Sequence, residues 1–164
     1  MIHHLVAAAA HAVPASAVTI RERKAAHAMR QKADMDYVHS RTLDIGFDDA
    51  VVRTRAALAS EGFGVITEVD IQKTLKAKIG VDFRRYLILG ACNPALAYEA
   101  LQLEANVGAM LPCNVVVQES LDGGVAISAI DPVASMQAID NPELKTKAAM
   151  VGEKLRAAID RLQD

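Results

Sequence analysis

Two kinds of apolar pattern alternate along the chain from Tyr37 to Leu162. In one kind every second residue is apolar, which is typical of a half-buried strand, and in the other apolar residues recur every three or four positions, which is typical of an amphipathic helix. The predicted strands are 37–43, 64–70, 85–91, 112–118 and 125–130, and the predicted helices begin at Phe47, after Asp70, at Pro94 and at Pro142. The pattern therefore predicts an α+β fold with the element order β-α-β-α-β-α-β-β-α.

The connections constrain how these strands pair. Asp122-Gly123-Gly124 separates the last two strands and is a hairpin signal, so these two strands should be antiparallel. The earlier strands are separated by helices, and they could pair in parallel or be split by an inserted strand. We predict a twisted mixed sheet with helices packed mainly on one face, and the strand order stays open.

Length and charge define the extent of the domain. The 164 residues suit one domain, but residues 1–34 hold five basic and two acidic side chains, whereas the net charge of the whole chain is −2. We predict that residues 1–34 form a poorly ordered N-terminal extension and that residues 35–164 form a single domain.

The same features bear on location and partners. The sequence contains no run of 18 apolar residues, so we expect no membrane-spanning helix. The weakly acidic net charge gives no reason to expect a nucleic-acid partner. Leu5–Ala17 loosely resembles the core of a signal peptide, but His3 and His4 stand where Lys or Arg is usual. Two cysteines are too few for a disulfide scaffold and fit a reducing compartment. We expect a cytoplasmic protein, with secretion as the alternative.

Several separated motifs in the domain occur in a characteristic order. They are Gly62-Phe63-Gly64-Val65-Ile66-Thr67-Glu68-Val69-Asp70, Gly80-Val81-Asp82-Phe83, Ile88-Leu89-Gly90-Ala91-Cys92-Asn93-Pro94, Leu111-Pro112-Cys113-Asn114-Val115-Val116-Val117 and Ile130-Asp131-Pro132. With this order and spacing the chain resembles, from about Tyr37 to Arg161, the family of domains of unknown function numbered 302. The resemblance implies a small α+β domain found in bacteria and archaea, often dimeric, with no established activity and no catalytic residues to carry over.

The two cysteines are the first candidates for chemistry. Asn93 and Pro94 are favoured at a helix start, so Cys92 should lie at a helix N-terminus, where the free amides can lower the pKa of a thiol. Cys113 lies near the start of another predicted strand and could line the same cleft if the two strands are neighbours. Alternatively, both cysteines are buried core residues. A metal site is weakly supported, because His39 is the one histidine in residues 35–164 and no CxxC motif occurs.

Polar residues near these positions give further candidates. Asn93 and Asn114 each follow a cysteine and could add amides to a mostly apolar ligand cleft, although Asn93 also suits a helix cap. Glu68 and Asp70 lie two residues apart in a predicted strand and could bind a cation or act in acid–base chemistry. The structural alternative is that Asp70 caps the next helix and Glu68 pairs with a lysine such as Lys76.

Our leading hypothesis is a module that binds a small ligand or a partner subunit in a cleft near Cys92, Asn93, Cys113 and Asn114. The rival hypotheses are a thiol-dependent enzyme or redox protein that uses Cys92, and a purely structural or interaction domain. The residues identify no cofactor. A sheet covered on one face only, together with the resemblance, predicts a homodimer.

Overall fold

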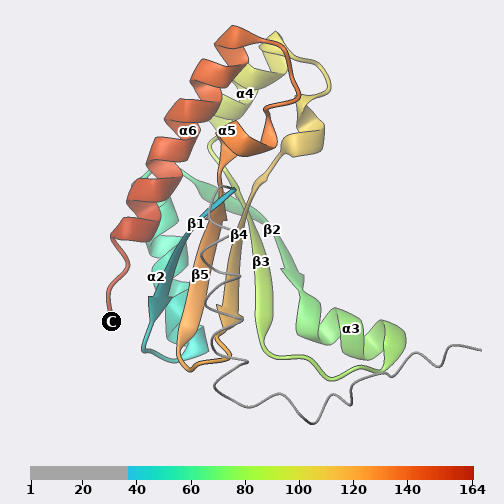
Figure 1. Cartoon of the computed structure of the whole chain (residues 1–164), viewed down its shortest axis with the longest axis vertical. Coiled ribbons are helices and arrows are strands. Elements are labelled where there is room, and N and C mark those ends of the chain that lie inside the picture. The colour runs from blue at the N-terminus through green and yellow to red at the C-terminus, as the bar shows by residue number, and fades with distance from the viewer. Residues whose placement is uncertain (1–36) are drawn as a thin grey trace, which may run out of the picture. The chain divides into compact units, whose positions relative to one another are not determined.

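The structure, a computed structural model, describes residues 37–164 (Figure 1). The predicted extension, residues 1–34, lies outside the described residues, so its separation from the domain stays a prediction. The described strands are β1 (Val38–Leu43), β2 (Gly64–Asp70), β3 (Tyr86–Cys92), β4 (Cys113–Glu119) and β5 (Val125–Ile130). The helices are α2 (Phe47–Ser60), α3 (Ile71–Ile79), α4 (Pro94–Leu103), α5 (Pro132–Ser135) and α6 (Pro142–Asp160), with a 3₁₀ turn η2 at Val107–Met110.

All five strands form one sheet in the order β1-β5-β4-β3-β2. Each neighbouring pair is antiparallel, so the α+β fold and the element order are confirmed, but the expectation of a mixed sheet is wrong. The β4–β5 hairpin is inserted between β1 and β3, which is the split arrangement that the connections left open.

The position of the helices explains the antiparallel pairing. A helix that crosses the face of a sheet returns the chain to the end where it started, and the next strand is then parallel. Here α3 and α4 lie at opposite ends of the sheet (Figure 1), so the chain leaves β2 or β3 and re-enters beside it in the opposite direction. The apolar periodicity that predicts these helices does not reveal whether they cross the sheet or extend from its end.

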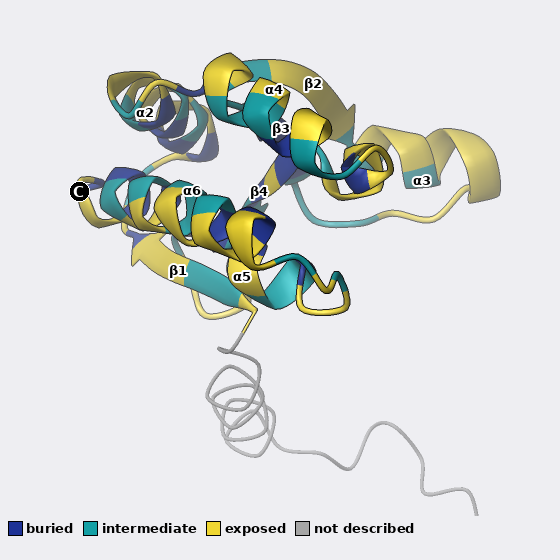
Figure 2. Ribbon diagram, turned by 90° about the horizontal axis from the view of Figure 1, so that it is seen from above, coloured by how far each residue is buried: buried dark blue, intermediate teal, exposed yellow. Residues whose placement is uncertain are grey.

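The helices α2 and α6 pack together on one face of the sheet and build the main core with it (Figure 2). The inward side chains come from alternate positions of the strands and from one stripe of each helix. The fully buried members include Leu43, Leu58, Leu89, Val115, Val117, Ile127, Leu155 and Ile159. With aromatic residues at only 4% of the chain, this core consists almost entirely of aliphatic side chains.

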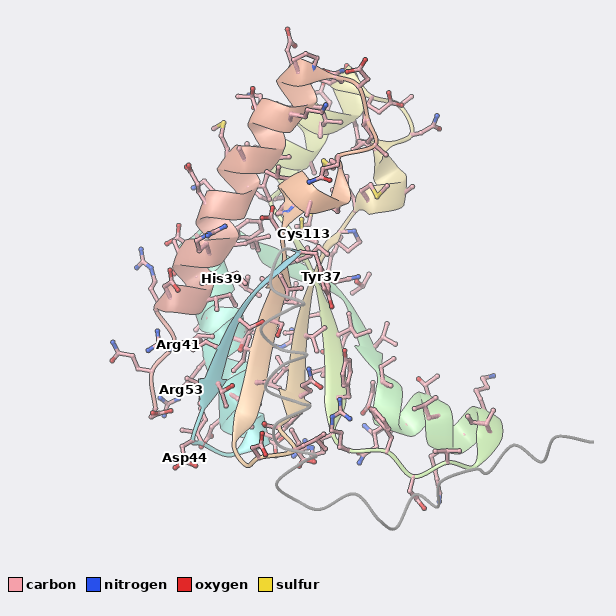
Figure 3. All side chains as sticks on the ribbon, in the orientation of Figure 1. Tyr37, His39, Arg41, Asp44, Arg53 and Cys113 are labelled. Carbon is pink, nitrogen blue, oxygen red and sulfur yellow. The ribbon has the colours of Figure 1, made fainter. Side chains whose placement is uncertain are left out.

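Edge strand β1 is tied to the last turn of α6. The His39 Nε2 atom lies 2.7 Å from the Asp160 Oδ1 atom, and the Arg41 guanidinium donates to the Asp160 carbonyl oxygen at 2.8 Å. Figure 3 labels His39 and Arg41 on β1. His39 is the one histidine in residues 35–164, and its partner is therefore a structural one, Asp160. Asp160 is far in sequence from Cys92 and Cys113.

A β-bulge between Val65 and Thr67 changes the pattern of β2. Strict alternation would place Val65, Thr67 and Val69 on one face. The register instead places Val65 opposite Ala91 on the helix-covered face, and Thr67 and Val69 on the other face. Bulges are common in edge strands, and the extra residue here is Ile66, which is 62% exposed.

Two short elements, α5 and η2, were not predicted from the sequence. Each has four residues, too few for an apolar period to show. No helix among the described residues has the length and apolar character needed to cross a bilayer.

Candidate functional site

The step from β3 into α4 forms as the sequence predicts. The Asn93 Oδ1 atom accepts a hydrogen bond from the Leu96 backbone amide at 3.2 Å, and Pro94 occupies the first turn of α4. The side-chain cap satisfies one of the free amides at the helix start. Cys92, the last residue of β3, is half-buried directly before this cap.

The antiparallel register brings the second cysteine to the same place. Cys113 at the start of β4 lies opposite Ala91 in β3, and it is buried. Figure 3 shows Cys113 at the end of β4 nearest to α4 and α5. Cys92, Asn93 and Cys113 together line one hollow, which we call the thiol pocket.

The rest of the thiol pocket is almost wholly apolar. Its walls come from β3, α4, α5, α6 and the loops beside them, and its one charged lining residue is Lys147. The apolar members are Phe63, Ala91, Leu96, Ala97, Ala100, Leu111, Pro132, Met136, Leu144, Ala148 and Val151. The ammonium group of Lys147 pairs with the Glu99 carboxylate across α4 and α6.

The pocket is open at the surface but narrow inside. The hollow measures about 430 Å³ when its solvent-open part is included, whereas the centre of a water-sized sphere can occupy about 30 Å³. A single water needs roughly 10–15 Å³ by the second measure. The pocket as it stands therefore holds about two waters, and anything larger must displace side chains.

Both thiols lie in surroundings that disfavour the thiolate. Burial, followed by the neighbouring Cys92, raises the pKa of Cys113 from 9.0 to about 11. Burial also raises the pKa of Cys92. The expected lowering by the helix N-terminus is thus wrong in direction, because apolar walls surround the sulfur and Asn93 already caps α4.

Asn114 does not join the pocket. Successive side chains of a strand point to opposite faces, and Asn114 follows Cys113, so it is exposed on the uncovered face of the sheet. Only three of the four residues predicted to share a cleft therefore come together.

Glu68 and Asp70 lie in a second, polar hollow bounded by Asp48, Lys73 and Arg85. Glu68 pairs with Arg55, and Asp70 Oδ1 accepts a hydrogen bond from the Lys73 amide at 2.9 Å. This hydrogen bond is the main reason that the pKa of Asp70 is lowered.

Most other charged side chains near this second hollow are paired in salt bridges. Arg85 holds Asp48 through two hydrogen bonds of 2.6 and 3.1 Å, which lowers the pKa of Asp48. Lys76, proposed as a partner of Glu68, pairs with Asp82 instead, at 2.7 Å. The structural alternative is therefore confirmed for Asp70, which caps α3. Glu68 does form a salt bridge, but its partner is Arg55 and not Lys76.

Within residues 37–164, no group of three or more His, Cys, Asp and Glu side chains lies close enough to hold a metal ion. Lys147 and the wall from α5 are the pocket residues that sequence reasoning missed. The apolar positions of α6 include Leu144, Ala148 and Val151, which recur at helical spacing, and Lys147 lies beside them at i+3 from Leu144. The spacing of these apolar residues could therefore have identified Lys147. The contribution of α5 could not have been predicted, because its four residues are too few to show an apolar period.

Fold and pocket together define a small α+β domain whose two thiols are enclosed by aliphatic side chains. Residues 39–162 match the family described as "Domain of unknown function DUF302", and the chain belongs to this family. A crystal structure titled "uncharacterized conserved protein DUF302 from Bacillus stearothermophilus" is similar, with 31% sequence identity and a TM-score of 0.72. The similarity covers 77% of this chain and 98% of that one. No curated protein matches the sequence.

Proposed function

We propose that the chain binds a small, mostly apolar ligand in the thiol pocket. The observation that carries the proposal is the convergence of Cys92, Asn93 and Cys113, from the ends of two strands and a helix start, in one hollow. Sites for small molecules are concave and mostly apolar, with a few polar groups that fix the orientation of the ligand. Asn93, Lys147 and the two thiols are the polar groups of this hollow.

The narrow interior limits the class of ligand. Only ligands much smaller than a drug-sized molecule suit a hollow of this size, and even they require side chains to move. Met136 is the best candidate for this movement, because an unbranched thioether changes its rotamer at little cost. Lys147, one-third exposed at the pocket, favours a ligand with a polar or anionic end directed to the rim.

Thiol chemistry is the weaker alternative. A nucleophilic or redox cysteine needs a lowered pKa or an adjacent base, whereas burial raises the pKa of Cys92 and of Cys113. The described residues that line the pocket include no histidine or carboxylate to act as the base. In this proposal the sulfur atoms of Cys92 and Cys113 contact the ligand as polarisable, unreactive groups.

Replacing Ala97 with leucine should fill the pocket. Ala97 lines the pocket from α4 and is half-buried, so the larger side chain should occupy the space of the ligand without disturbing the main core. Ala95→Leu on the exposed face of the same helix is the matched control. We expect the unchanged protein and the control to bind small aliphatic or aromatic fragments with dissociation constants of about 1 mM or below. Ala97→Leu should weaken this binding at least about tenfold.

Ligand-observed NMR with a set of such fragments measures the effect. Native mass spectrometry of the purified full chain, run in parallel, should show whether a small molecule is retained. Failure of every fragment to bind, or equal binding by Ala97→Leu and Ala95→Leu, would contradict the proposal. Either result would favour a purely structural domain with cysteines as core residues.

A further inference from the structure

Sulfur-containing side chains gather in the thiol pocket. Residues 37–164 contain five of them, which are Cys92, Met110, Cys113, Met136 and Met150. Three of the five, Cys92, Cys113 and Met136, are among the fifteen residues that line the pocket. An even distribution over the 128 described residues would place fewer than one of the five there. Binding of an apolar ligand does not require sulfur, so it does not explain why these three side chains converge.

Three separate elements bring the sulfur atoms together. Cys92 ends β3, and Cys113 begins β4 opposite Ala91, so the two cysteines are neighbours across the strand pair. The sequence contains no CxxC motif, and only the register of β3 with β4 places these thiols side by side. Met136 directly follows α5 and is 5% exposed. The fold therefore holds two thiols and one thioether at the same hollow.

These side chains suit a soft metal ion. Thiolates and thioethers select ions such as Cu(I), whereas carboxylates, carbonyls and water suit hard cations. Zinc in structural sites is tetrahedral and takes four ligands from cysteine, histidine or a carboxylate. The described residues that line the pocket include no histidine or carboxylate to complete such a set. A soft monovalent ion, which is stable with two or three sulfur ligands, fits this set better than zinc does.

The interior of the pocket also matches a single ion. About 30 Å³ is open to the centre of a water-sized sphere, which is room for about two waters. One metal ion occupies this space as it stands, whereas an organic ligand requires side chains to move. The apolar walls keep water and hard ligands away from the ion, as the hydrophobic shell of a metal site does.

We propose that Cys92, Cys113 and Met136 form a binding site for a monovalent soft metal ion of the Cu(I) class. On binding, two S–H bonds break, two sulfur–metal bonds form and two protons pass to the solvent, with no transfer of electrons. The thioether of Met136 adds a neutral third ligand. The complex then has one negative charge, and Lys147 supplies the one positive charge of the pocket lining.

The test titrates the reduced full chain with two soft ions. Ag(I), added as silver nitrate in chloride-free buffer, is monovalent like Cu(I) and keeps its oxidation state in air. Native mass spectrometry measures how many silver ions each chain binds, and we expect one. Competition with a chromophoric Cu(I) chelator under nitrogen measures the affinity for copper, and the same competition with a zinc indicator measures the affinity for Zn(II).

Substitutions of the three ligands should weaken the binding of Cu(I) to different extents. Cys92→Ala and Cys113→Ala each leave a single thiolate, so each should weaken binding at least about a hundredfold. Met136→Leu preserves the size of the side chain but removes the sulfur atom, and it should weaken binding about tenfold. The matched control is Met150→Leu on α6, because Met150 is 42% exposed and lies outside the pocket lining. Circular dichroism establishes that each variant is folded.

Three results would overturn the proposal. Binding of no silver ion, or of two per chain, would mean that the two thiols do not share one ion. Equal affinity of Met136→Leu and Met150→Leu for Cu(I) would remove the thioether from the site, and this comparison decides even if a cysteine variant does not fold. Binding of Zn(II) as tight as that of Cu(I) would contradict a site for soft ions.

The inference shares the thiol pocket with the proposed apolar ligand but does not depend on it. Fragment binding and metal binding are measured separately on the unchanged protein. Fragment binding without metal binding would contradict only the metal site, and metal binding without fragment binding would contradict only the proposed function.

Discussion

We expect the thiol of Cys113 to be alkylated about a hundredfold more slowly near neutral pH than the thiol of an unstructured cysteine. The thiolate is the reacting species, and a rise of the pKa from 9.0 to about 11 lowers its fraction by about two powers of ten. Cys92 is less buried, so it should react more slowly than an unstructured cysteine but faster than Cys113. Iodoacetamide labelling of the Cys92→Ser and Cys113→Ser variants across the pH range separates the two thiols.

In denaturant the two thiols should react at the same rate, which provides the internal control. Labelling of folded Cys113 at the rate of an unstructured cysteine, or with a midpoint near pH 9, would mean that the pocket is not the apolar enclosure described here. A midpoint for Cys92 well below the ordinary value would revive the thiol-enzyme alternative.

The raised pKa of Cys113 also links stability to alkaline pH. The unfolded chain loses this proton near pH 9, whereas the folded protein keeps it until about pH 11. The contribution of the site to stability is therefore complete below pH 9 and is lost as pH rises toward 11. A Cys113→Ala variant should lack this part of the pH dependence.

Gly90→Ala should destabilise the fold by about 2 kcal/mol, the middle of the range for overpacking a close contact. Gly90 is buried in β3 under Thr67 and Pro112, and a Cβ atom there would lie 2.6 Å from the Pro112 Cγ atom and closer still to the Thr67 hydroxyl. The threonine can rotate, but the proline ring cannot. Urea denaturation of the two proteins measures the difference.

The control for this substitution is Gly108→Ala in the 3₁₀ turn. A Cβ atom on Gly108 meets nothing within 4 Å, and its backbone is not left-handed, so this change should leave stability nearly unaltered. Equal stability of the two alanine variants would contradict the close approach of Thr67 and Pro112 to β3. Because Pro112 directly precedes Cys113, loss of this packing should also loosen the thiol pocket.

Local rules explain why much of the fold could be predicted from sequence. Asp70 and Asn93 were expected to cap helices, and both side chains accept hydrogen bonds from amides three residues later, at Lys73 and Leu96. Gly80 ends α3 and adopts a left-handed φ of 72°, a conformation that glycine adopts readily. These features depend on a few neighbouring residues, so the sequence alone is enough to find them.

What could not be predicted depends on how distant segments meet. Whether α3 and α4 cross the sheet or extend from its ends decides between parallel and antiparallel pairing, and their apolar stripes are compatible with both. The bulge at Ile66 reverses the face of Val65, although the surrounding residues alternate regularly. Such features are fixed by the neighbouring strand.

In the candidate site, too, the local features could be predicted and the contacts between distant segments could not. The helix cap at Asn93 predicted where Cys92 would lie, and the register of β3 with β4 was needed to bring Cys113 beside it. Alternation along β4 should have excluded Asn114, which points away from Cys113. The direction of the thiol pKa shifts could not be predicted, because it depends on walls from α4, α5 and α6 that meet only in the folded chain.

The most direct test of the ligand-binding proposal is a map of backbone amide shifts during titration with the tightest-binding fragment. The proposal predicts that the largest shifts occur at Cys92, Asn93 and Cys113 and along α6 near Lys147, with much smaller shifts in Ala97→Leu. Shifts centred on the polar hollow at Glu68 and Asp70, or on the uncovered face of the sheet around Asn114, would contradict it.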